Sequence, residues 1–466
     1  MIPTSADIVI CGAGIAGVSA AWHLAARHGI TNVLLLEEGS PLMLTSDKST
    51  EAYRNWWPGP GDAMVRFMNR SIDLLEELAD LSDNYFAMNR RGYVFLTADP
   101  ATAERYRLSA EESQRLGAGD LRVHRGRSGL QPADDPPFPA HVAEGYAPEL
   151  GGADLVLDPA IIQSRFPFIS KDAVAMLHPR RCGWLSAQQL GMWLLSEAKA
   201  RGVRLVNGRM TAVDTTGGRV NGVTVRANGE EHHIQTRVFV NAAGPLVDKV
   251  GQMLGVEIPV FNELHGKVSI NDPLGIVPRD APLMIWSDPV TLPWDDEERE
   301  ALAADDETRR LTEPFPAGVH FRPEGGPGAT TLLLLWTYHV EPTPAVWPVR
   351  FDPEYAEVVV RGLTRMVPGL AAYAGNFGRP YIDGGYYCKT RENRPLIGPL
   401  PVEGAYILGA LSGYGIMASQ AGADLLAAHI TGGELPGYAG AMSLSRYDDP
   451  AYRALLDSWD PTTGQL

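Results

Sequence analysis

The chain has 466 residues, of which 45% are apolar and 21% charged, and its formal net charge is −16 at pH 7; this length suits two domains, each with its own core. The composition excludes a wholly disordered or fibrous protein, and the acidic charge argues against nucleic acid or an anionic membrane as a partner. Three widely spaced cysteines, Cys11, Cys182 and Cys388, argue against a disulfide framework and a zinc site, so we expect no metal and a cytoplasmic location.

The first segment predicts a strand, a tight turn and a helix. Residues 6–11 are a short apolar run, which leads into Gly12-Ala13-Gly14-Ile15-Ala16-Gly17 and then a helical pattern through Ala26. A second strand over 32–36 ends in Glu37, twenty positions after the third glycine, as in a dinucleotide-binding βαβ unit. We expect neither a signal peptide nor a transmembrane segment, because no basic leader and no long apolar run is present.

The residues of this turn have distinct expected roles. Gly12 permits the sharp turn, Gly14 lets the backbone approach a pyrophosphate, and Gly17 lets the helix lie close to the strand. The free N–H groups at Ile15 and Ala16, together with the positive end of the helix dipole, would face the phosphates. A tight turn without a cofactor is the alternative interpretation.

An acidic residue at the end of the second strand sets the choice of nucleotide. Glu37 can accept hydrogen bonds from both hydroxyls of an adenosine ribose and would repel a 2′-phosphate, which disfavours NADP. Glu38 is an alternative acidic partner, but strand alternation from Val33 and Leu35 favours Glu37.

Later segments continue to alternate between helical and strand patterns. An amphipathic helix is expected over 62–81, and an acidic stretch over 295–307 predicts a solvated helix or loop. The last strand, 405–408, is followed by a glycine turn at 412–415 and a helix rich in small residues. Further expected strands are 93–97, 203–206, 218–227, 232–235, 238–240, 267–270, 318–322 and 330–337.

The whole chain resembles the D-amino acid oxidase superfamily of flavoproteins, in particular its sarcosine oxidase, glycine oxidase and dimethylglycine dehydrogenase branch. The resemblance is carried, in family order, by VICGAGIAGVSAAWHL with LLLEEG, KSTEAYR, RGVRLVNGRMTAV, FVNAAGP, TRENRPLIGP and GALSGYGIMASQAGADLLA. It implies an α/β fold: a Rossmann-like, glutathione-reductase-like FAD-binding domain with an inserted α+β substrate domain on a large, mostly antiparallel sheet. The expected FAD-binding domain comprises 1–90, 178–258 and 384–466, and the substrate-binding domain comprises 91–177 and 259–383.

The resemblance also implies contacts with FAD beyond the first turn. Ser49 and Thr50 would lie beside the phosphates and the ribityl chain, Val213 would present its backbone to the adenine, and Ala243 and Gly244 would pass close to the cofactor. A helix N-terminus would approach the flavin pyrimidine, where hydride uptake leaves negative charge. Its expected contacts are Gly413, Tyr414, Gly415, Ile416 and Met417.

Departures from the family pattern predict non-covalent FAD. Gly385 stands where monomeric sarcosine oxidases carry the tethering cysteine, and Glu51 stands where the dimethylglycine branch has a histidine. A tether through Cys388 is a minor alternative, because a buried cysteine is more often packing. Met417 replaces a family lysine in the turn before the last helix, so donors there would come from the backbone.

Amine oxidation by a flavin requires orientation, a dry pocket and an anchor for substrate rather than a nucleophile. Alternation places His265 and Lys267 on one strand face, where the lysine could stabilise the reduced flavin or assist dioxygen, or face solvent. Arg322 is a candidate to bind a substrate carboxylate, with a surface ion pair as the alternative. Tyr387 could present its hydroxyl to substrate, and Arg54, beside two tryptophans, could lie near the flavin or only stack in the scaffold.

These observations predict an FAD-dependent oxidase of a small amine or amino acid, with hydride transfer to the flavin, imine hydrolysis and reoxidation by dioxygen. A dehydrogenase of the same substrate class that uses a quinone or protein acceptor is the second hypothesis. An FAD-binding protein without amine oxidase activity is the third. A monooxygenase or reductase is disfavoured, because only one dinucleotide fingerprint is present. Substrate identity and oligomeric state stay open.

Overall fold

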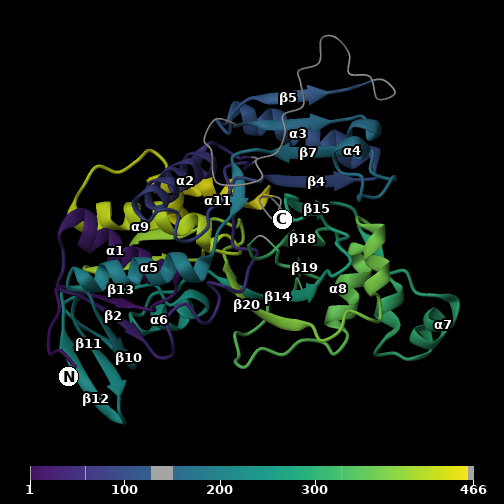
Figure 1. Ribbon diagram of the computed structural model, residues 1–466. Coiled ribbons are helices and arrows are strands. Elements are labelled where there is room, and N and C mark those ends of the chain that lie inside the picture. The colour runs from purple at the N-terminus through teal and green to yellow at the C-terminus, as the bar shows by residue number, and fades with distance from the viewer. Residues whose placement is uncertain (1, 58, 127–150, 327, 339, 460–466) are drawn as a thin grey trace.

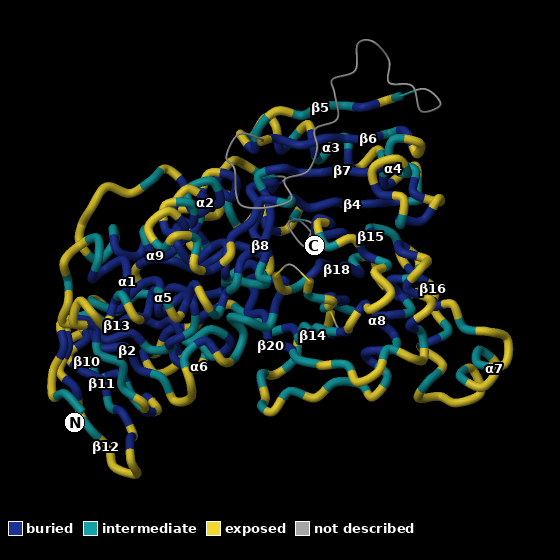
Figure 2. Tube along the Cα trace, in the orientation of Figure 1, coloured by how far each residue is buried: buried dark blue, intermediate teal, exposed yellow. Residues whose placement is uncertain are grey.

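The computed structural model describes residues 2–57, 59–126, 151–326, 328–338 and 340–459. These residues form two lobes, each built on its own large sheet (Figure 1). Buried residues, dark blue in Figure 2, follow the strands and the inner faces of the helices. Among the residues described, no helix is long and apolar enough to cross a membrane.

The first lobe is built on a six-stranded sheet whose strands come from distant parts of the sequence. Its core strands are short apolar runs, as expected for parallel strands covered on both faces. Five strands run parallel and β21 joins antiparallel. In sheet order the strands are β21 (Leu396–Pro399), β22 (Ala405–Gly409), β13 (Val238–Asn241), β1 (Ile8–Cys11), β2 (Val33–Glu37) and β9 (Arg204–Asn207).

Helices cover one face of this sheet. Side chains such as Ile10 and Leu35 point into the core that the sheet shares with these helices. Small residues, including Ala21 on one helix and Ala421 on the neighbouring one, let the helices approach closely. The helices are α1 (Ile15–His28), α5 (Ala187–Ala200) and α9 (Gly415–Thr431), with α2 (Ala63–Leu81) packed on α9.

A three-stranded antiparallel sheet covers the opposite face. Val9 and Leu34, which alternate with the residues of the helical side, pack against it. Its strands are β10 (Arg209–Thr216), β11 (Arg219–Ala227) and β12 (Glu230–Gln235), and α6 (Val247–Met253) lies beside them. The first lobe is therefore a layered α/β unit with the strand ends of β1 and β13 open at one edge.

The second lobe is built on a nine-stranded sheet. Its pairs are antiparallel except β4 with β15 and β5 with β6. In sheet order the strands are β20 (Tyr381–Lys389), β14 (Phe261–Asn271), β19 (Thr331–Leu335), β18 (His320–Pro323), β15 (Leu283–Trp286), β4 (Tyr93–Thr97), β7 (Ala175–Pro179), β6 (Ala153–Val156) and β5 (Leu121–His124). This arrangement confirms the expected large, mostly antiparallel sheet.

Helix α8 (Tyr355–Leu363) packs Val358 and Val359 into the same core as Val268 and Leu334 of this sheet. The acidic segment forms α7 (Asp296–Ala304), which buries no residue, as its sequence predicted. Several further α-helices and strands complete the fold. They are β3 (Ala52–Arg54), α3 (Pro100–Arg115), α4 (Pro159–Arg165), β8 (Cys182–Trp184), β16 (Val290–Thr291), β17 (Pro314–Phe315), α10 (Ala439–Met442) and α11 (Pro450–Asp457).

Strand β20 is one of the places where the chain passes between the two lobes. β20 forms an edge of the nine-stranded sheet and crosses the expected domain boundary at residue 384 before the chain continues into the first lobe. The domain boundaries themselves stay a prediction. The position of β20 places its last residues between the two lobes, which matters for the site described next.

Candidate active site

The turn after β1 is shaped by two close backbone approaches. Gly12 has a φ of +104°, and a Cβ built on it would lie 2.4 Å from the Ala242 carbonyl oxygen. A Cβ on Gly17 would lie 1.9 Å from the Gly12 carbonyl oxygen, so helix α1 approaches the turn only because residue 17 is glycine. Gly14 is the N-cap of the helix and has no side chain to cover the N–H groups of the first turn, so a ligand can approach this end of the helix.

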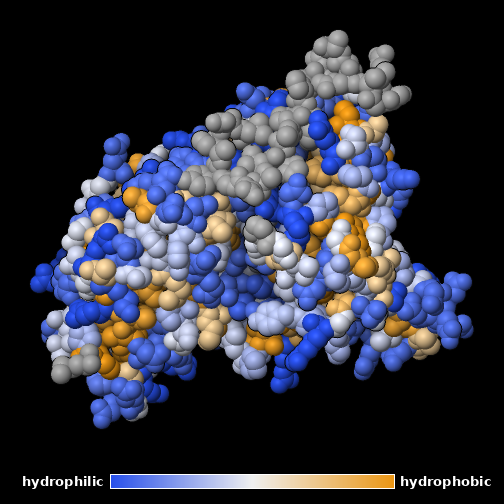
Figure 3. Space-filling model, in the orientation of Figure 1, coloured by the Kyte–Doolittle hydropathy of each residue, from blue (hydrophilic) through white to orange (hydrophobic). Residues whose placement is uncertain are grey.

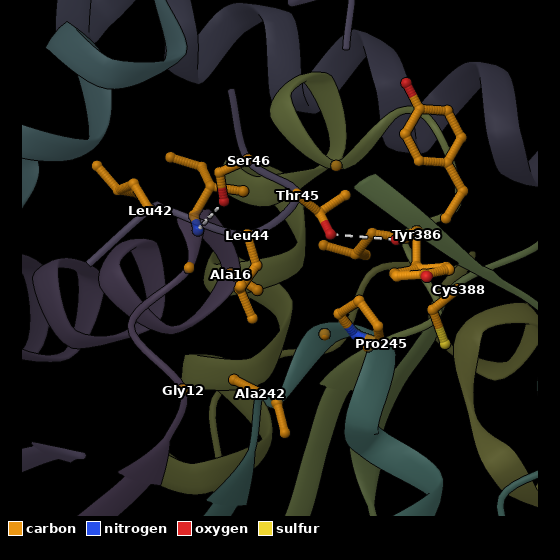
Figure 4. A pocket seen from close by; sticks show the side chains of 18 of the residues that line it. Gly12, Ala16, Leu42, Leu44, Thr45, Ser46, Ala242, Pro245, Tyr386 and Cys388 are labelled. Atoms are coloured by element: carbon orange, nitrogen blue, oxygen red, sulfur yellow. Dashed lines mark hydrogen bonds between the residues drawn. The ribbon is translucent and has the colours of Figure 1, made fainter. Parts of the chain in front are cut away.

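A cleft of about 840 Å³, open mouth included, begins at this turn (Figure 4). It reaches from Glu37 and Ser40 to Tyr387 and Gly413, at the start of α9. Segments 42–46, 242–245 and 408–412 supply most of the rest of its wall. The wall is largely apolar side chains and backbone, as in a site for a planar, elongated ligand.

Glu37 lines the cleft, and each of its carboxylate oxygens already accepts one hydrogen bond from a backbone N–H. One oxygen accepts the Ala13 N–H at 2.9 Å and the other accepts the Gly39 N–H at 2.9 Å. Since an ionised carboxylate offers about four lone-pair sites, capacity remains for two ligand hydroxyls. Glu38 is exposed, pairs with Arg209 at 3.5 Å and is absent from the cleft lining, so the geometry favours Glu37.

Sequence analysis did not identify Ser46 as a site residue. The Ile15 N–H donates to the Ser46 hydroxyl at 2.9 Å, and Figure 4 shows this side chain pointing at the start of α1. The hydroxyl hydrogen is left to bind an anion at the helix N-terminus. Its neighbour Thr45 donates to the Tyr386 carbonyl at 3.1 Å and so ties this loop to β20. A serine in a loop 31 residues from the turn carries no local sequence signal.

The other predicted cofactor residues divide between two cavities. Those that line the first cleft are Gly12, Gly14, Ile15, Ala16, Ser49, Ala243, Gly244, Gly413, Gly415 and Ile416. Thr50, Tyr414 and Met417 instead line the second cavity described below, together with Gly413. Gly17 and Val213 line neither; Val213 packs its side chain into the core between β2 and the three-stranded sheet.

Cys388 lines the first cleft, and its position bears on covalent attachment. Burial, assisted by the charge of Asp248, raises the pKa of the Cys388 thiol to about 12. The side chain is therefore a neutral thiol rather than a nucleophilic thiolate at neutral pH.

A second cavity of about 1590 Å³, open mouth included, lies against the nine-stranded sheet. It meets the first cleft at Tyr387, Ser412 and Gly413, which line both. A Cβ on Gly413 would lie 2.5 Å from the Tyr387 ring, so the turn before α9 is packed directly against that ring. On the face of the molecule drawn in Figure 3, hydrophilic side chains cover much of the surface, in line with the acidic composition.

A hydrogen-bonded network lies in the wall of the second cavity. His265 stacks on Tyr387 with ring centroids 3.7 Å apart. Its Nε2 lies 3.2 Å from Glu263 Oε2, and its Nδ1 lies 2.7 Å from the Thr337 hydroxyl. The Lys389 ammonium donates to both oxygens of Glu263 at 3.0 Å. Burial lowers the pKa of His265, with Glu263 opposing, so the ring is neutral at pH 7.

Arg54 also lines the second cavity, and its side chain is held by aromatic rings. The guanidinium carbon lies 4.6 Å from the centre of the Trp57 ring and 5.9 Å from that of Tyr93. The residue is 5% exposed, and burial lowers its pKa, yet an arginine stays charged at any physiological pH. This places a fixed positive charge in an apolar wall.

Two of the predicted catalytic residues lie outside both cavity linings. The Arg322 guanidinium donates to the Thr50 carbonyl at 2.7 Å and to Glu51 at 3.2 Å, and it also pairs with Glu324. Because protein acceptors occupy the guanidinium, the geometry does not favour Arg322 as an anchor for a substrate carboxylate. The Lys267 ammonium donates to the Asp47 carbonyl and lines neither cavity.

His320, on the same strand as Arg322, does line the second cavity. Its Nδ1 lies 2.7 Å from the Gly318 carbonyl, which can only accept, so Nδ1 carries the proton and Nε2 has a lone pair. Burial lowers the pKa of His320 to about 4, so this ring is also neutral at pH 7.

The residues of the first cleft fit FAD. Ser46 occupies the Ile15 N–H group that the sequence predicted to be free, so the Ala16 N–H at the helix N-terminus and the Ser46 hydroxyl remain for a diphosphate. Glu37 lies where an adenosine ribose would bind. The far end of the cleft opens at Tyr387 and Gly413 into a cavity large enough for a substrate. The described residues hold no group of three or more metal-ligating side chains.

Comparisons with known proteins agree with this fit. A family model described as "DAO: FAD dependent oxidoreductase" matches residues 7–429. The chain is 23% identical over 307 residues to FAD-dependent oxidoreductase domain-containing protein 1 of Mus musculus, covering 62% of this chain and 56% of the relative. It is 26% identical over 219 residues to sarcosine oxidase subunit beta of Rhodobacter capsulatus, covering 46% of this chain and 47% of that relative. The matches span about half the length of these relatives.

Two solved structures share the fold over nearly the whole chain. L-proline dehydrogenase from P. horikoshii has a TM-score of 0.72 at 19% identity, covering 96% of this chain and 99% of that one. Glycine oxidase from Geobacillus kaustophilus has a TM-score of 0.70 at 14% identity, covering 95% of this chain and 99% of that one. These comparisons confirm the predicted fold class and the family resemblance.

Proposed function

The chain belongs to the DAO family of FAD-dependent oxidoreductases, and from this premise we propose that it oxidises the C–N bond of a small amine or amino acid. The observation that carries the proposal is the junction of the two cavities at Tyr387, Ser412 and Gly413. When bound, FAD supplies the acceptor for the hydride that leaves the carbon next to the amine nitrogen. The names of relatives, sarcosine oxidase and glycine oxidase among them, support this substrate class.

The residues of the first cleft would hold the cofactor without a covalent bond. The turn from Gly12 to Ala16 and the Ser46 hydroxyl would bind the diphosphate, and Glu37 would accept from the ribose hydroxyls. The backbone N–H groups at the start of α9, from Gly415 to Met417, carry the positive end of a 17-residue helix. That end would stabilise the negative charge of the reduced flavin in place of the missing family lysine.

The second cavity supplies the groups that a substrate needs. Arg54 would bind a substrate carboxylate through two parallel N–H donors. Phe95, Ile285 and Leu335 form an apolar part of the wall that would exclude water from the reacting carbon. Tyr387 separates this cavity from the first cleft and would hold the substrate at a fixed distance from the cofactor.

We propose dioxygen as the electron acceptor, with imine release and hydrolysis after oxidation. A quinone or a protein carrier is the second candidate, which two observations favour. Met417 replaces the family lysine, and the Lys267 ammonium is bound to the Asp47 carbonyl, outside both cavity linings.

The free thiols Cys11, Cys182 and Cys388 support a cytoplasmic location.

The test is the visible spectrum of the purified protein, followed by anaerobic mixing with a panel of N-methyl and D-amino acids. Bleaching of a flavin band by at least one amine is expected, and no bleaching by any of them would contradict the proposal. Hydrogen peroxide formed during aerobic turnover distinguishes the oxidase from the dehydrogenase. Reduction of the flavin by NADPH instead would indicate a different class of flavoenzyme.

A further inference from the structure

The second cavity contains three groups joined in series by hydrogen bonds. Thr337 and His265 line the cavity, whereas Glu263 is 5% exposed and lies behind them. The Thr337 hydroxyl is 2.7 Å from His265 Nδ1, and His265 Nε2 is 3.2 Å from Glu263. This sequence of hydroxyl, imidazole and carboxylate is the order that moves a proton from a cavity into a buried acid-base pair.

The chemistry of the partners fixes the direction of each hydrogen bond. An ionised carboxylate can only accept, so His265 Nε2 carries the hydrogen and donates to Glu263. The Nδ1 of the neutral ring then has a lone pair, and the Thr337 hydroxyl donates to it. Lys389 holds Glu263 in the ionised form: although burial alone raises the pKa of this carboxyl, the hydrogen bond from His265 and the Lys389 charge lower it below its usual value. The lone pairs of the Thr337 oxygen remain for a donor in the cavity.

An amine substrate arrives at neutral pH as an ammonium ion. The ammonium has no lone pair to assist the departure of a hydride, so one proton must leave the nitrogen before oxidation. A base is therefore needed in the wall of the second cavity.

We propose that Thr337, His265 and Glu263 form a relay that deprotonates the bound substrate ammonium. The N–H bond breaks with its electron pair left on the substrate nitrogen, and the proton binds the Thr337 oxygen. The Thr337 hydroxyl proton moves in the same step to His265 Nδ1, and the resulting imidazolium faces the Glu263 carboxylate. Charge and atoms balance without any oxidant, and Thr337 is the member that touches substrate. The inference rests on the proposed function, because only an amine substrate supplies the proton.

The charged and titratable groups around His265 suit this role. Glu263, on the same strand β14, favours the imidazolium, and Lys389 on β20 opposes it. Tyr387 on β20 covers one face of the ring as a neutral phenol, because burial raises its pKa above its usual value. His320 on β18 is neutral, so it adds no fixed charge, but its Nε2 lone pair makes it the competing base.

The first experiment measures the histidine tautomers of the FAD-loaded protein by ¹⁵N NMR without substrate. The expected result is a neutral His265 with hydrogen on Nε2. Thr337→Val should raise the pKa of His265, because a donor to the Nδ1 lone pair is lost, and Glu263→Gln should lower it. If Nδ1 of His265 carried the hydrogen in the wild-type protein, it could not accept the Thr337 proton, and the relay would be wrong.

The second experiment follows the pH dependence of anaerobic flavin reduction by an amine from the panel. At pH 7, Thr337→Val should slow reduction about 100-fold, the scale of general base catalysis. The acid limb of its pH profile should move to higher pH, from that of a histidine toward that of a free amine. Thr337→Ser, which keeps the hydroxyl, should restore the wild-type profile, and a merely structural loss would not produce this shift.

The outcomes separate the relay from the proposed function. If no amine reduces the flavin, the proposed function fails, and the relay with it. If an amine reduces the flavin with the same pH profile in the wild type and in Thr337→Val, the relay alone is wrong. If His320→Gln rather than Thr337→Val moves the acid limb, His320 is the base and the relay is again wrong.

Discussion

The imidazole of His265 lies flat against the phenol ring of Tyr387, with ring centroids 3.7 Å apart and an angle of 21° between the planes. His265 belongs to β14 and Tyr387 to β20, which pair in the nine-stranded sheet. Tyr387 lines both cavities, and Gly413 packs against its ring. The position of this one ring therefore sets the passage between the two cavities.

Gly413→Ala tests that relationship. The added methyl group would lie 2.5 Å from the Tyr387 ring, closer than real contacts allow, so the ring must move. We expect the rate of anaerobic flavin reduction to fall about 10- to 100-fold, because a shift of the order of 1 Å misaligns reactants. Gly433→Ala is the control, since its nearest neighbours would lie at 3.6 Å. Equal rates in the two variants would show that the ring position does not matter.

Gly12→Ala should prevent binding of FAD as well as strain the backbone. Its φ of +104° and the 2.4 Å approach to the Ala242 oxygen together disfavour any side chain. We expect loss of the flavin absorbance and a decrease of about 1–3 kcal/mol or more in the free energy of unfolding. Gly229→Ala has a comparable φ of +82° with no neighbour within 4 Å, so it should lose stability but retain the flavin. Flavin retained at wild-type occupancy in Gly12→Ala would refute this assignment of the turn.

Glu37→Gln should weaken FAD binding by about 10- to 100-fold, the equivalent of losing about 1.5–3 kcal/mol from hydrogen bonds to a charged acceptor. The measurement is the Kd of the apoprotein for FAD by fluorescence quenching. Glu38→Gln is the matched control, because Glu38 is exposed and lines no part of the cleft. The assignment of Glu37 is wrong if the two variants bind FAD equally well.

Arg54→Met should raise KM for an amino acid about 100-fold or more, because a charge-assisted pair with the carboxylate is lost. An amine of similar size without a carboxylate should be affected much less, which separates anchoring from a general loss of structure. Arg91→Met is the control variant: Arg91 also stacks on a tryptophan, 5.1 Å from the Trp184 ring centre, but lines neither cavity. An equal loss for both substrates would argue against the anchor.

The stability of the protein should depend on a buried histidine between α1 and α9. Burial lowers the pKa of His23 to about 3, so between pH 6.5 and 3 the unfolded chain binds more protons than the folded one. The free energy of unfolding should therefore fall by about 2 kcal/mol per such histidine between pH 7 and pH 5. Urea titrations of His23→Gln should show a smaller fall, and His28→Gln, exposed at the end of the same helix, should behave as the wild type. Identical pH dependence of His23→Gln and the wild type would contradict the assignment.

The fold and the first cleft follow from local sequence features. The glycines of the first turn, the helix behind them and Glu37 are close together in the chain, so spacing alone predicts their geometry. The apolar strands and the amphipathic helix over 62–81 are local patterns too, and α2 spans Ala63–Leu81. The family resemblance then supplies the order of the segments and the second lobe.

The walls of the second cavity depend on contacts that no local pattern contains. Lys389 and Glu263 are 126 residues apart and meet only because β14 and β20 pair in one register. The sequence singled out Arg322 as a candidate anchor for a substrate carboxylate, but it could not show that the Thr50 carbonyl and Glu51 would bind the guanidinium. Thr337 is the last residue of the expected strand 330–337 but lies beyond the end of β19, and nothing in the sequence marked its hydroxyl as part of a site.

The shared strand β20 constrains how the protein can change. Its last residues contribute Tyr386 and Cys388 to one cavity, Lys389 to the other and Tyr387 to both. Mutations of these residues would change FAD binding and substrate specificity together. Phe95 and Ile285, on β4 and β15, border the second cavity alone. Natural divergence and laboratory redesign of specificity can therefore proceed on those inner strands while the flavin stays bound.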